Sequence, residues 1–150
     1  GAVIFHDLFN QRIKNIDFVW DEVLSFEGTS GPYVQYTYAR AKSILRKADY
    51  QKNAQQIAYE KLTDDYSFKL IKQLQGYEEA VNKAAERYEP SVVAKYLIAL
   101  STTFNKFYHE CPILKAEEKE KQAKLELVEL TQEVIKECCE LLGMNCPEEM

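Results

Sequence analysis

The sequence predicts an all-α protein, a bundle of helices. Apolar residues recur three and four positions apart in three long segments, which begin near Pro32, Pro90 and Glu117. No segment alternates apolar and polar residues for long, so no sheet is expected. The five glycines and four prolines are few for 150 residues, and most lie between the periodic segments. We therefore expect one domain that is long enough to bury a core.

Short elements are expected before the first long helix. They are a helix at residues 2–9, an extended piece at 16–18 and a second short helix at 20–26. In the first of these helices, Ile4, Phe5 and Leu8 are expected to turn inward. The run at residues 27–31 is the most glycine-rich part of the chain and favours a hinge or turn.

The first long helix is expected to run from Pro32 to about Ala48. Proline suits the start of a helix because its φ is fixed at a helical value and its missing N–H needs no partner there. Thr29 or Ser30 could cap this start. The apolar face of the helix is predicted to carry Val34, Tyr38, Ala41 and Leu45. Another face carries Tyr36, Arg40, Ser43 and Lys47.

The outer face of this helix favours nucleic acid. Four basic residues and no acidic ones lie between Pro32 and Lys47, and tyrosines are interleaved with them. An aromatic and basic surface above an apolar inner face suits single-stranded nucleic acid. The alternative is that the tyrosines belong to the core and Arg40 forms a surface ion pair.

The middle of the chain is predicted less sharply. Residues 49–65 show no clear pattern, and the polar run at 51–56 is expected to be exposed. Asp64 or Asp65 suits the cap of a helix that Gly76 ends, and residues 77–88 suit a further helix. The first of these helices runs through the apolar residues Phe68, Leu70, Ile71 and Leu74. In the second, the residues expected to turn inward are Ala80, Val81, Ala84 and Ala85.

Two long helices complete the prediction. The helix from Pro90 to His109 has so wide an apolar arc that we expect it at the centre of the bundle. Cys111-Pro112 breaks it, and the last helix spans residues 117–142 before Gly143. The apolar stripe of the last helix is predicted to be Leu127, Leu130, Val134, Cys138 and Leu141.

The charge is unevenly placed along the chain. The formal net charge is −5, and residues 111–150 alone carry five basic and ten acidic groups. This balance argues against strong non-specific nucleic-acid binding, but it leaves room for a local basic face. No apolar run approaches the ~18 residues of a membrane span, and no signal peptide is recognised. The chain has no initiator Met, so we expect it to begin inside a longer protein, and the expected compartment is the cytoplasm.

Neither catalysis nor metal binding is expected within these residues. The four cysteines form no C-x-x-C pair, so buried free thiols in a reducing compartment are favoured over zinc. His6 beside Asp7 and His109 beside Glu110 are typical of ordinary surface polarity. No glycine-rich phosphate loop and no hydrolase motif is present. We therefore expect no catalytic residues, metal ligands or cofactor here.

Several segments resemble one family. Residues 26–36, Phe-Glu-Gly-Thr-Ser-Gly-Pro-Tyr-Val-Gln-Tyr, followed by Ala39-Arg40, resemble the entry to the anticodon-binding domain of arginyl-tRNA synthetases. Residues 1–8 resemble the lead-in to that domain, and residues 90–114 resemble its central helix. Leu141-Leu142-Gly143-Met144, with Pro147 and Met150, resembles its C-terminus. Residues 48–90 match more loosely, mostly by pattern.

The resemblance implies a fold, a partner and a parent enzyme. The fold would be the helical bundle of the class I synthetase anticodon-binding domain, of the DALR type. Residues 31–150 would form this domain, and residues 1–30 would be the tail of the preceding region. The partner would be the anticodon loop of the arginine tRNA. The His-Ile-Gly-His and Lys-Met-Ser-Lys signatures are absent, so ATP would be used by a catalytic domain elsewhere in the same, monomeric chain.

The resemblance also implies which residues meet the RNA. They are Tyr33, Tyr36, Arg40, Phe104, Asn105, Tyr108 and Met150. Asn105 is expected on a polar face opposite the core, where its amide could both donate to and accept from a base edge. For the two aromatic residues of the central helix the alternative is plain packing. For Met150 it is a frayed tail, whose neighbours Glu148 and Glu149 would repel phosphates.

The chain departs from the family's pattern at one place, and a competing function remains open. The family's last helix often begins Ala-Arg-Leu, and here Ala123-Lys124-Leu125 keeps the charge but loses the bidentate guanidinium. A structural ion pair at that place is therefore not assured by the resemblance. The competing function is a helical protein-interaction module that binds no RNA, and the acidic last helix favours it.

Overall fold

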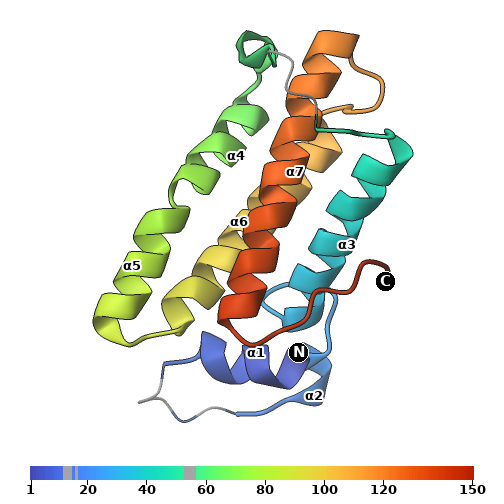
Figure 1. The fold of residues 1–150 in the computed structure, drawn as a ribbon. Coiled ribbons are helices and arrows are strands. Elements are labelled where there is room, and N and C mark those ends of the chain that lie inside the picture. The colour runs from blue at the N-terminus through green and yellow to red at the C-terminus, as the bar shows by residue number, and fades with distance from the viewer. Residues whose placement is uncertain (12–14, 16, 53–56) are drawn as a thin grey trace.

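The computed structural model describes all residues except 12–14, 16 and 53–56, and the described part is built from helices (Figure 1). In order they are α1 (Ala2–Phe9), α2 (Trp20–Val23), α3 (Gly31–Lys47), a 3-10 turn η1 (Tyr59–Lys61), α4 (Asp65–Gln75), α5 (Tyr77–Arg87), α6 (Ser91–Glu110) and α7 (Glu118–Leu141). No strand occurs in the described ranges. The prediction of an all-α bundle is confirmed.

The bundle is organised around α6 and α7. These two helices pack on each other, α3 packs on both from one side, and α4 packs on both from the other (Figure 1). Helix α5 follows α4 along α6, while α1 lies under the bundle against α3 and α6. The expectation that α6 is the central helix is therefore confirmed. Across the part of the chain that the structure describes, no helix has the length and apolar content to cross a membrane.

Helix α3 begins where its sequence predicts. The Ser30 hydroxyl accepts a hydrogen bond from the Tyr33 amide at 3.1 Å, which satisfies one of the free N–H groups of the first turn. Pro32 occupies that turn and Ala48 ends the helix. Gly31 lies in a tight contact, because a Cβ there would lie 3.0 Å from the Ala2 Cα of α1.

The buried stripe of α3 is shifted slightly from its prediction. Val34, Tyr38 and Ala41 are buried as expected, but the fourth buried position is Ile44, and Leu45 is only half-buried. The reason is that α3 contacts both α6 and α7, so its buried arc is wider than a stripe at strict four-residue steps. This wider arc also takes in Thr37 and Ala39.

The short N-terminal helices differ in detail from their prediction. In α1, Phe5 is fully buried, whereas Ile4 is exposed. Helix α2 is a single turn that ends at Val23, three residues early, and Leu24 is exposed. In the segment predicted as extended, residue 16 lies outside the described residues, and residues 17–18 form no regular element.

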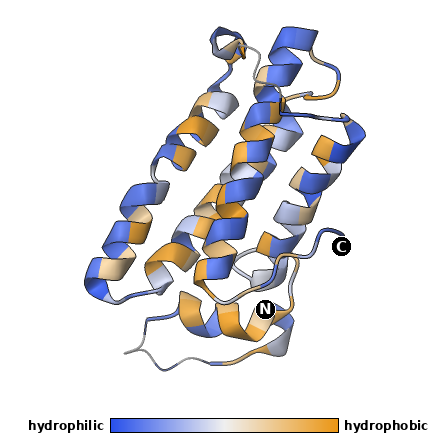
Figure 2. Ribbon diagram, viewed as in Figure 1, coloured by the Kyte–Doolittle hydropathy of each residue, from blue (hydrophilic) through white to orange (hydrophobic). Residues whose placement is uncertain are grey.

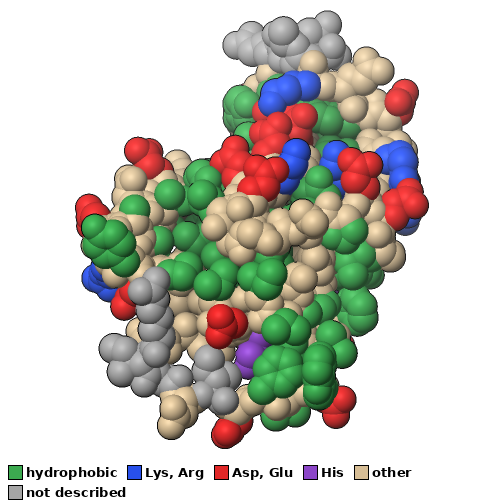
Figure 3. Space-filling model, turned by 60° about the horizontal axis from the view of Figure 1, so that its bottom comes forward, with side chains coloured by type: hydrophobic (Ala, Val, Ile, Leu, Met, Phe, Trp, Pro, Cys, Tyr) green, Lys and Arg blue, Asp and Glu red, His purple; other side chains and the backbone are tan. Residues whose placement is uncertain are grey.

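Several exposed apolar side chains gather at the α1 and α2 end of the molecule (Figures 2 and 3). We call them the α1–α2 apolar patch: Val3, Ile4, Phe18, Val19, Trp20, Leu24 and Phe26. An apolar patch of this kind on a protein surface is typical of a contact with another folded unit.

Asp64 ties the start of α4 to neighbouring elements. Its carboxylate accepts hydrogen bonds from the Ser67 amide at 2.8 Å, from the Ser67 hydroxyl at 2.7 Å and from the Cys111 thiol at 3.1 Å. Burial alone would raise the pKa of Asp64, but these hydrogen bonds lower it below its usual value. The predicted cap is therefore confirmed, with Asp64 as the capping residue.

Helices α4 and α5 run nearly in line (Figure 1). Gly76 joins them at φ −75°, a helical value, so the axis is interrupted without a sharp turn. In α5, Ala84 is buried as predicted but Ala85 is exposed, and in α4, Leu70 is buried while Phe68 is exposed. These helices have bundle neighbours on one side only. The polar run at residues 51–56 is described only at residues 51–52, which are exposed.

The buried face of α7 also differs from the predicted stripe. Leu127 and Cys138 are buried, but Leu130 and Val134 are half-buried and Leu141 is exposed. Contacts with α3, α4 and α6 bury a different set, which includes Ala123, Leu125, Val128, Ile135 and Cys139. The four cysteine thiols are free, and burial raises the pKa of Cys138 to about 12.

Lys124 forms an ion pair despite the loss of the guanidinium. Its side chain is 4% exposed, and its Nζ lies 2.6 Å from the Glu120 Oε1 one turn earlier in α7. A single-point contact therefore replaces the bidentate pair that an arginine would offer.

Candidate nucleic-acid interface

Arg40 lies between two tyrosine rings. Its guanidinium carbon is 4.7 Å from the ring centroid of Tyr36, one turn earlier in α3, and 5.1 Å from that of Tyr108 in α6. These distances are within the range of cation–π attraction. Tyr36 is 38% exposed and Tyr108 39%, so both rings also present surface to solvent. The predicted pairing of Tyr36 with Arg40 on one face of α3 is confirmed.

Asn105 of α6 holds the arginine in place. The Arg40 Nη1 donates to the Asn105 Oδ1 at 2.6 Å. The Asn105 Nδ2 donates to the Tyr33 hydroxyl and to the Thr37 Oγ1, each at 3.0 Å. Because a guanidinium can only donate, the oxygen of the amide has to face it, and this fixes the orientation of the amide.

Thr37 completes this network beneath the surface. Its hydroxyl donates to the Tyr33 carbonyl at 2.9 Å, so it has a lone pair free to accept from Asn105. Thr37 is fully buried. Sequence reasoning missed Thr37, although its position, four residues after Tyr33 and three before Arg40, places it on the same side of the helix.

The predicted exposure of Asn105 is wrong. The side chain is 9% exposed and lies under α3, not on a polar face opposite the core. Both hydrogens of its amide are already donated within the protein. In this structure the Asn105 amide is engaged by Arg40, Tyr33 and Thr37, all of them residues of α3.

For Phe104 the structure favours the alternative of plain packing. Its ring is 0% exposed and packs 6.3 Å from the ring of Phe107, inside the core. A base cannot stack on a ring that is enclosed on both faces. Of the two aromatic positions expected on α6, only Tyr108 reaches the surface.

Neither Tyr33 nor Arg40 fits the alternative of a core tyrosine and a surface ion pair. Tyr33 is half-buried, and its hydroxyl accepts from Asn105, so it supports the site from beneath. None of the ion pairs found among the described residues includes Arg40. Phe26, a further residue that sequence reasoning missed, packs edge-on to Tyr36 with 6.4 Å between ring centroids, and it is exposed.

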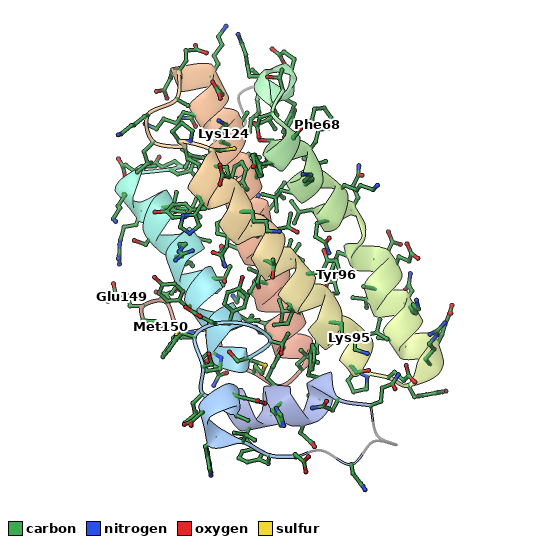
Figure 4. All side chains as sticks on the ribbon, turned by 180° about the vertical axis from the view of Figure 1, so that it is seen from behind. Phe68, Lys95, Tyr96, Lys124, Glu149 and Met150 are labelled. Atoms are coloured by element: carbon green, nitrogen blue, oxygen red, sulfur yellow. The ribbon has the colours of Figure 1, made fainter. Side chains whose placement is uncertain are left out.

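A hollow of about 460 Å³ opens beside Arg40. We call it the Arg40 hollow, and its lining includes Tyr36, Arg40, Ser43, Lys47, Tyr108 and Met150. Met150 is 54% exposed and comes from the C-terminal tail, which lies beside α3 (Figure 4). The predicted approach of Met150 to the surface of Tyr36 and Arg40 agrees with this position.

The tail is held on α3 by polar contacts. The Gln35 Nε2 donates to the Asn145 carbonyl at 2.7 Å. Glu148 lies 3.7 Å from the Lys42 Nζ, and Glu149 is paired with Arg46. The carboxylates that were expected to repel phosphates therefore neutralise two cations of the same surface.

The arrangement suits the binding of a ligand. It combines a fixed cation, two partly exposed rings and a hollow large enough for a planar group. No group of three His, Cys, Asp or Glu side chains is placed to hold a metal ion in the part of the chain that is described.

Comparison with known proteins identifies a matching family model and several similar proteins. The family model described as DALR anticodon binding domain matches residues 34–150. The chain is 54% identical to an arginine–tRNA ligase of Enterococcus faecalis and 49% identical to one of Lactobacillus johnsonii. Each alignment covers 100% of this chain and 26% of the relative. The chain thus spans about a quarter of the length of these relatives.

Solved structures share the fold. The arginyl-tRNA synthetase of Thermus thermophilus matches with a TM-score of 0.87 at 38% identity, over 100% of this chain and 26% of that one. That of Plasmodium falciparum matches with a TM-score of 0.85 at 28% identity, over 99% of this chain and 26% of that one.

Proposed function

The chain belongs to the DALR anticodon-binding domain family, and from this premise we propose that it recognises the anticodon loop of an arginine tRNA. The observation that carries the proposal is the position of Arg40 between the rings of Tyr36 and Tyr108 beside a hollow. The chemistry is recognition, with no bond made or broken by these residues.

Unpaired bases of the loop would stack on the two rings. Stacking on an aromatic side chain contributes about 1–3 kcal/mol per base, and anticodon loops carry splayed, unpaired bases. A guanidinium has five N–H donors, and Asn105 takes only one of those on Arg40. The others can reach a phosphate or a base edge. Met150, in the lining of the same hollow, would add apolar contact.

The middle base is the natural target of this site. All arginine codons have G in the middle position, so the anticodon's central base is always C. A pocket that accepts this one base serves every arginine tRNA. The fixed geometry around Arg40 supports such a pocket, because a side chain already held by Asn105 and two rings loses little freedom on binding.

We assign the chain to a longer arginine–tRNA ligase. The catalytic region that uses ATP would precede it in the same polypeptide, and the whole enzyme would act as a cytoplasmic monomer. Residues 1–30 would be the tail of that region, with residues 31–150 as the binding domain. The α1–α2 apolar patch supports this division, because its exposed side chains suit a contact with the preceding region.

Fluorescence titration tests the proposal. The protein should bind an arginine tRNA more tightly than an unrelated tRNA, and it should lose this preference when the middle anticodon base is changed from C to U. Tyr108→Ala should weaken binding by about 1–3 kcal/mol, as for one lost stack. Equal affinity for all three RNAs would favour the alternative, a helical interaction module without specific RNA binding.

A further inference from the structure

A second basic surface lies on the other side of α6. We call it the α4–α6 groove, a hollow of about 510 Å³ lined by Tyr66, Lys69, Lys72, Gln73, Thr103 and Lys106. The three lysines are exposed. The Lys69 Nζ is 5.5 Å from the ring centroid of Tyr66, within the range of cation–π attraction.

The helices that form this side of the molecule lack carboxylates over long stretches. No Asp or Glu occurs in residues 66–77, which run from α4 to the first residue of α5, in residues 90–109, which include most of α6, or in residues 31–48, which include all of α3. The chain as a whole has 24 acidic residues, so its charges are strongly separated. The acidic residues that border these stretches in sequence are Asp49, Asp65, Glu78, Glu89 and Glu110.

The groove lysines have no counter-charge from the protein. None of the ion pairs found among the described residues includes Lys69, Lys72 or Lys106. The helix dipole explains a cation in the last turn of α4, where Lys72 lies, but it does not explain Lys69 or Lys106. Like charges lining one groove repel each other, and an anion placed among them removes this cost.

The groove and the Arg40 hollow border α6 from its two sides, the groove with α4 and the hollow with α3. Viewed from behind, α6 runs between α3 and α4 (Figure 4). Tyr108 borders the Arg40 hollow, and Lys106, two residues earlier in α6, borders the groove. Two positions in a helix differ by about 200°, so Tyr108 and Lys106 project to opposite sides of α6, the first toward α3 and the second toward α4. A ligand that crosses α6 therefore meets both surfaces.

We propose that the α4–α6 groove binds phosphates of the RNA stem whose loop lies at the Arg40 hollow, an inference that rests on the proposed function. The groove carries point charges and hydrogen-bonding side chains but no exposed aromatic pair. Contacts of this kind position a nucleic acid without reading its bases. Lysine suits a phosphate because its ammonium is a compact charge with three donors.

Replacing the three lysines tests the groove. The variant Lys69→Gln/Lys72→Gln/Lys106→Gln is compared with a control of equal charge change on other surfaces, Lys83→Gln/Lys119→Gln/Lys136→Gln. Both are titrated with an anticodon stem-loop of arginine tRNA and with an oligonucleotide of the loop sequence alone, over a series of salt concentrations. All six side chains are exposed, so both proteins should remain folded.

The expected result is selective for the stem. The groove variant should bind the stem-loop about tenfold or more weakly at low salt, and its plot of log K against log salt should flatten by about 2 in slope. Its affinity for the loop oligonucleotide should be unchanged, and the control should match the parent. The single variant Lys106→Gln should flatten the slope by about 0.7–0.9.

Each other outcome overturns the inference. If the groove variant keeps its stem-loop affinity while Arg40→Ala loses it, the groove is not a phosphate site and the proposed function stands. If the control weakens binding as much as the groove variant, the effect belongs to net charge. If neither Arg40→Ala nor the groove variant changes binding, the proposed function fails together with the groove.

Discussion

Replacing Asn105 by alanine separates a residue that positions Arg40 from one that touches RNA. The substitution removes one charge-assisted and two neutral hydrogen bonds. Arg40 and Tyr33 are half-buried and can turn to water, while Thr37 keeps its bond to the Tyr33 carbonyl. The substitution should therefore cost less than the full sum of three hydrogen bonds, about 2 kcal/mol of unfolding free energy, which lowers the melting temperature by about 4–8 °C.

The same substitution should weaken RNA binding indirectly. Without Asn105 the guanidinium keeps its two rings but loses its anchor, so binding has to order a freer side chain. Ordering such a side chain costs about 0.5–1.5 kcal/mol, which is roughly a 2- to 12-fold loss of affinity. Arg40→Ala should lose more, because it removes the charge itself. The double variant should be no weaker than Arg40→Ala alone.

Titration of the parent, the two single variants and the double variant with the anticodon stem-loop completes the cycle. Thr102→Ala, on the same helix and half-exposed, serves as the matched control and should leave both affinity and melting temperature unchanged. If the losses of the two single variants add in the double variant, Asn105 contributes to RNA binding independently of Arg40. The positioning role would then be refuted, and direct reading of a base by Asn105 would return.

Three further results are expected. Tyr36→Ala should weaken RNA binding by about 1–3 kcal/mol and hardly change the melting temperature, since the ring is more than a third exposed; loss of folding would make it a core residue. Glu148→Gln/Glu149→Gln should strengthen RNA binding at low salt, whereas weaker binding would show that the tail carboxylates assist it. Asp64→Ala should cost about 0.5–2 kcal/mol in chemical unfolding at neutral pH. Because folding lowers the pKa of Asp64, its carboxylate stabilises the protein fully above the unfolded pKa of about 3.9, and this stabilisation is lost as the pH falls through the lower folded pKa. The difference in unfolding free energy between the parent and Asp64→Ala should therefore shrink in acid. A difference that does not change with pH would contradict an ionised cap.

The helices were predictable because their signals are local. Apolar spacing and end residues determined α3, α6 and α7 to within a residue or two. Ser30 and Asp64 act as caps through contacts that span three residues, so the sequence alone contains the whole interaction. The same reasoning gave the Tyr36 and Arg40 pair, which is four residues apart on one helix.

The exact buried face was less predictable because it depends on neighbours. Ile44 replaces Leu45 in the core, and Leu141 is exposed, since α3 and α7 each touch more than one helix. Asn105 shows the same limit at the site. Its hydrogen bonds join residues 65–72 positions apart, and only the packing of α3 on α6 brings them together. A polar residue on a central helix looks exposed until its covering helix is known.

The tail explains how this acidic chain can carry a cationic binding surface. Glu148 and Glu149 already act as counter-ions for Lys42 and Arg46. Phosphates that replace these carboxylates release fewer salt ions than phosphates that meet bare lysines. Most of the salt dependence of RNA binding should therefore come from Arg40 and the α4–α6 groove, whose cations have no such partner among the described residues.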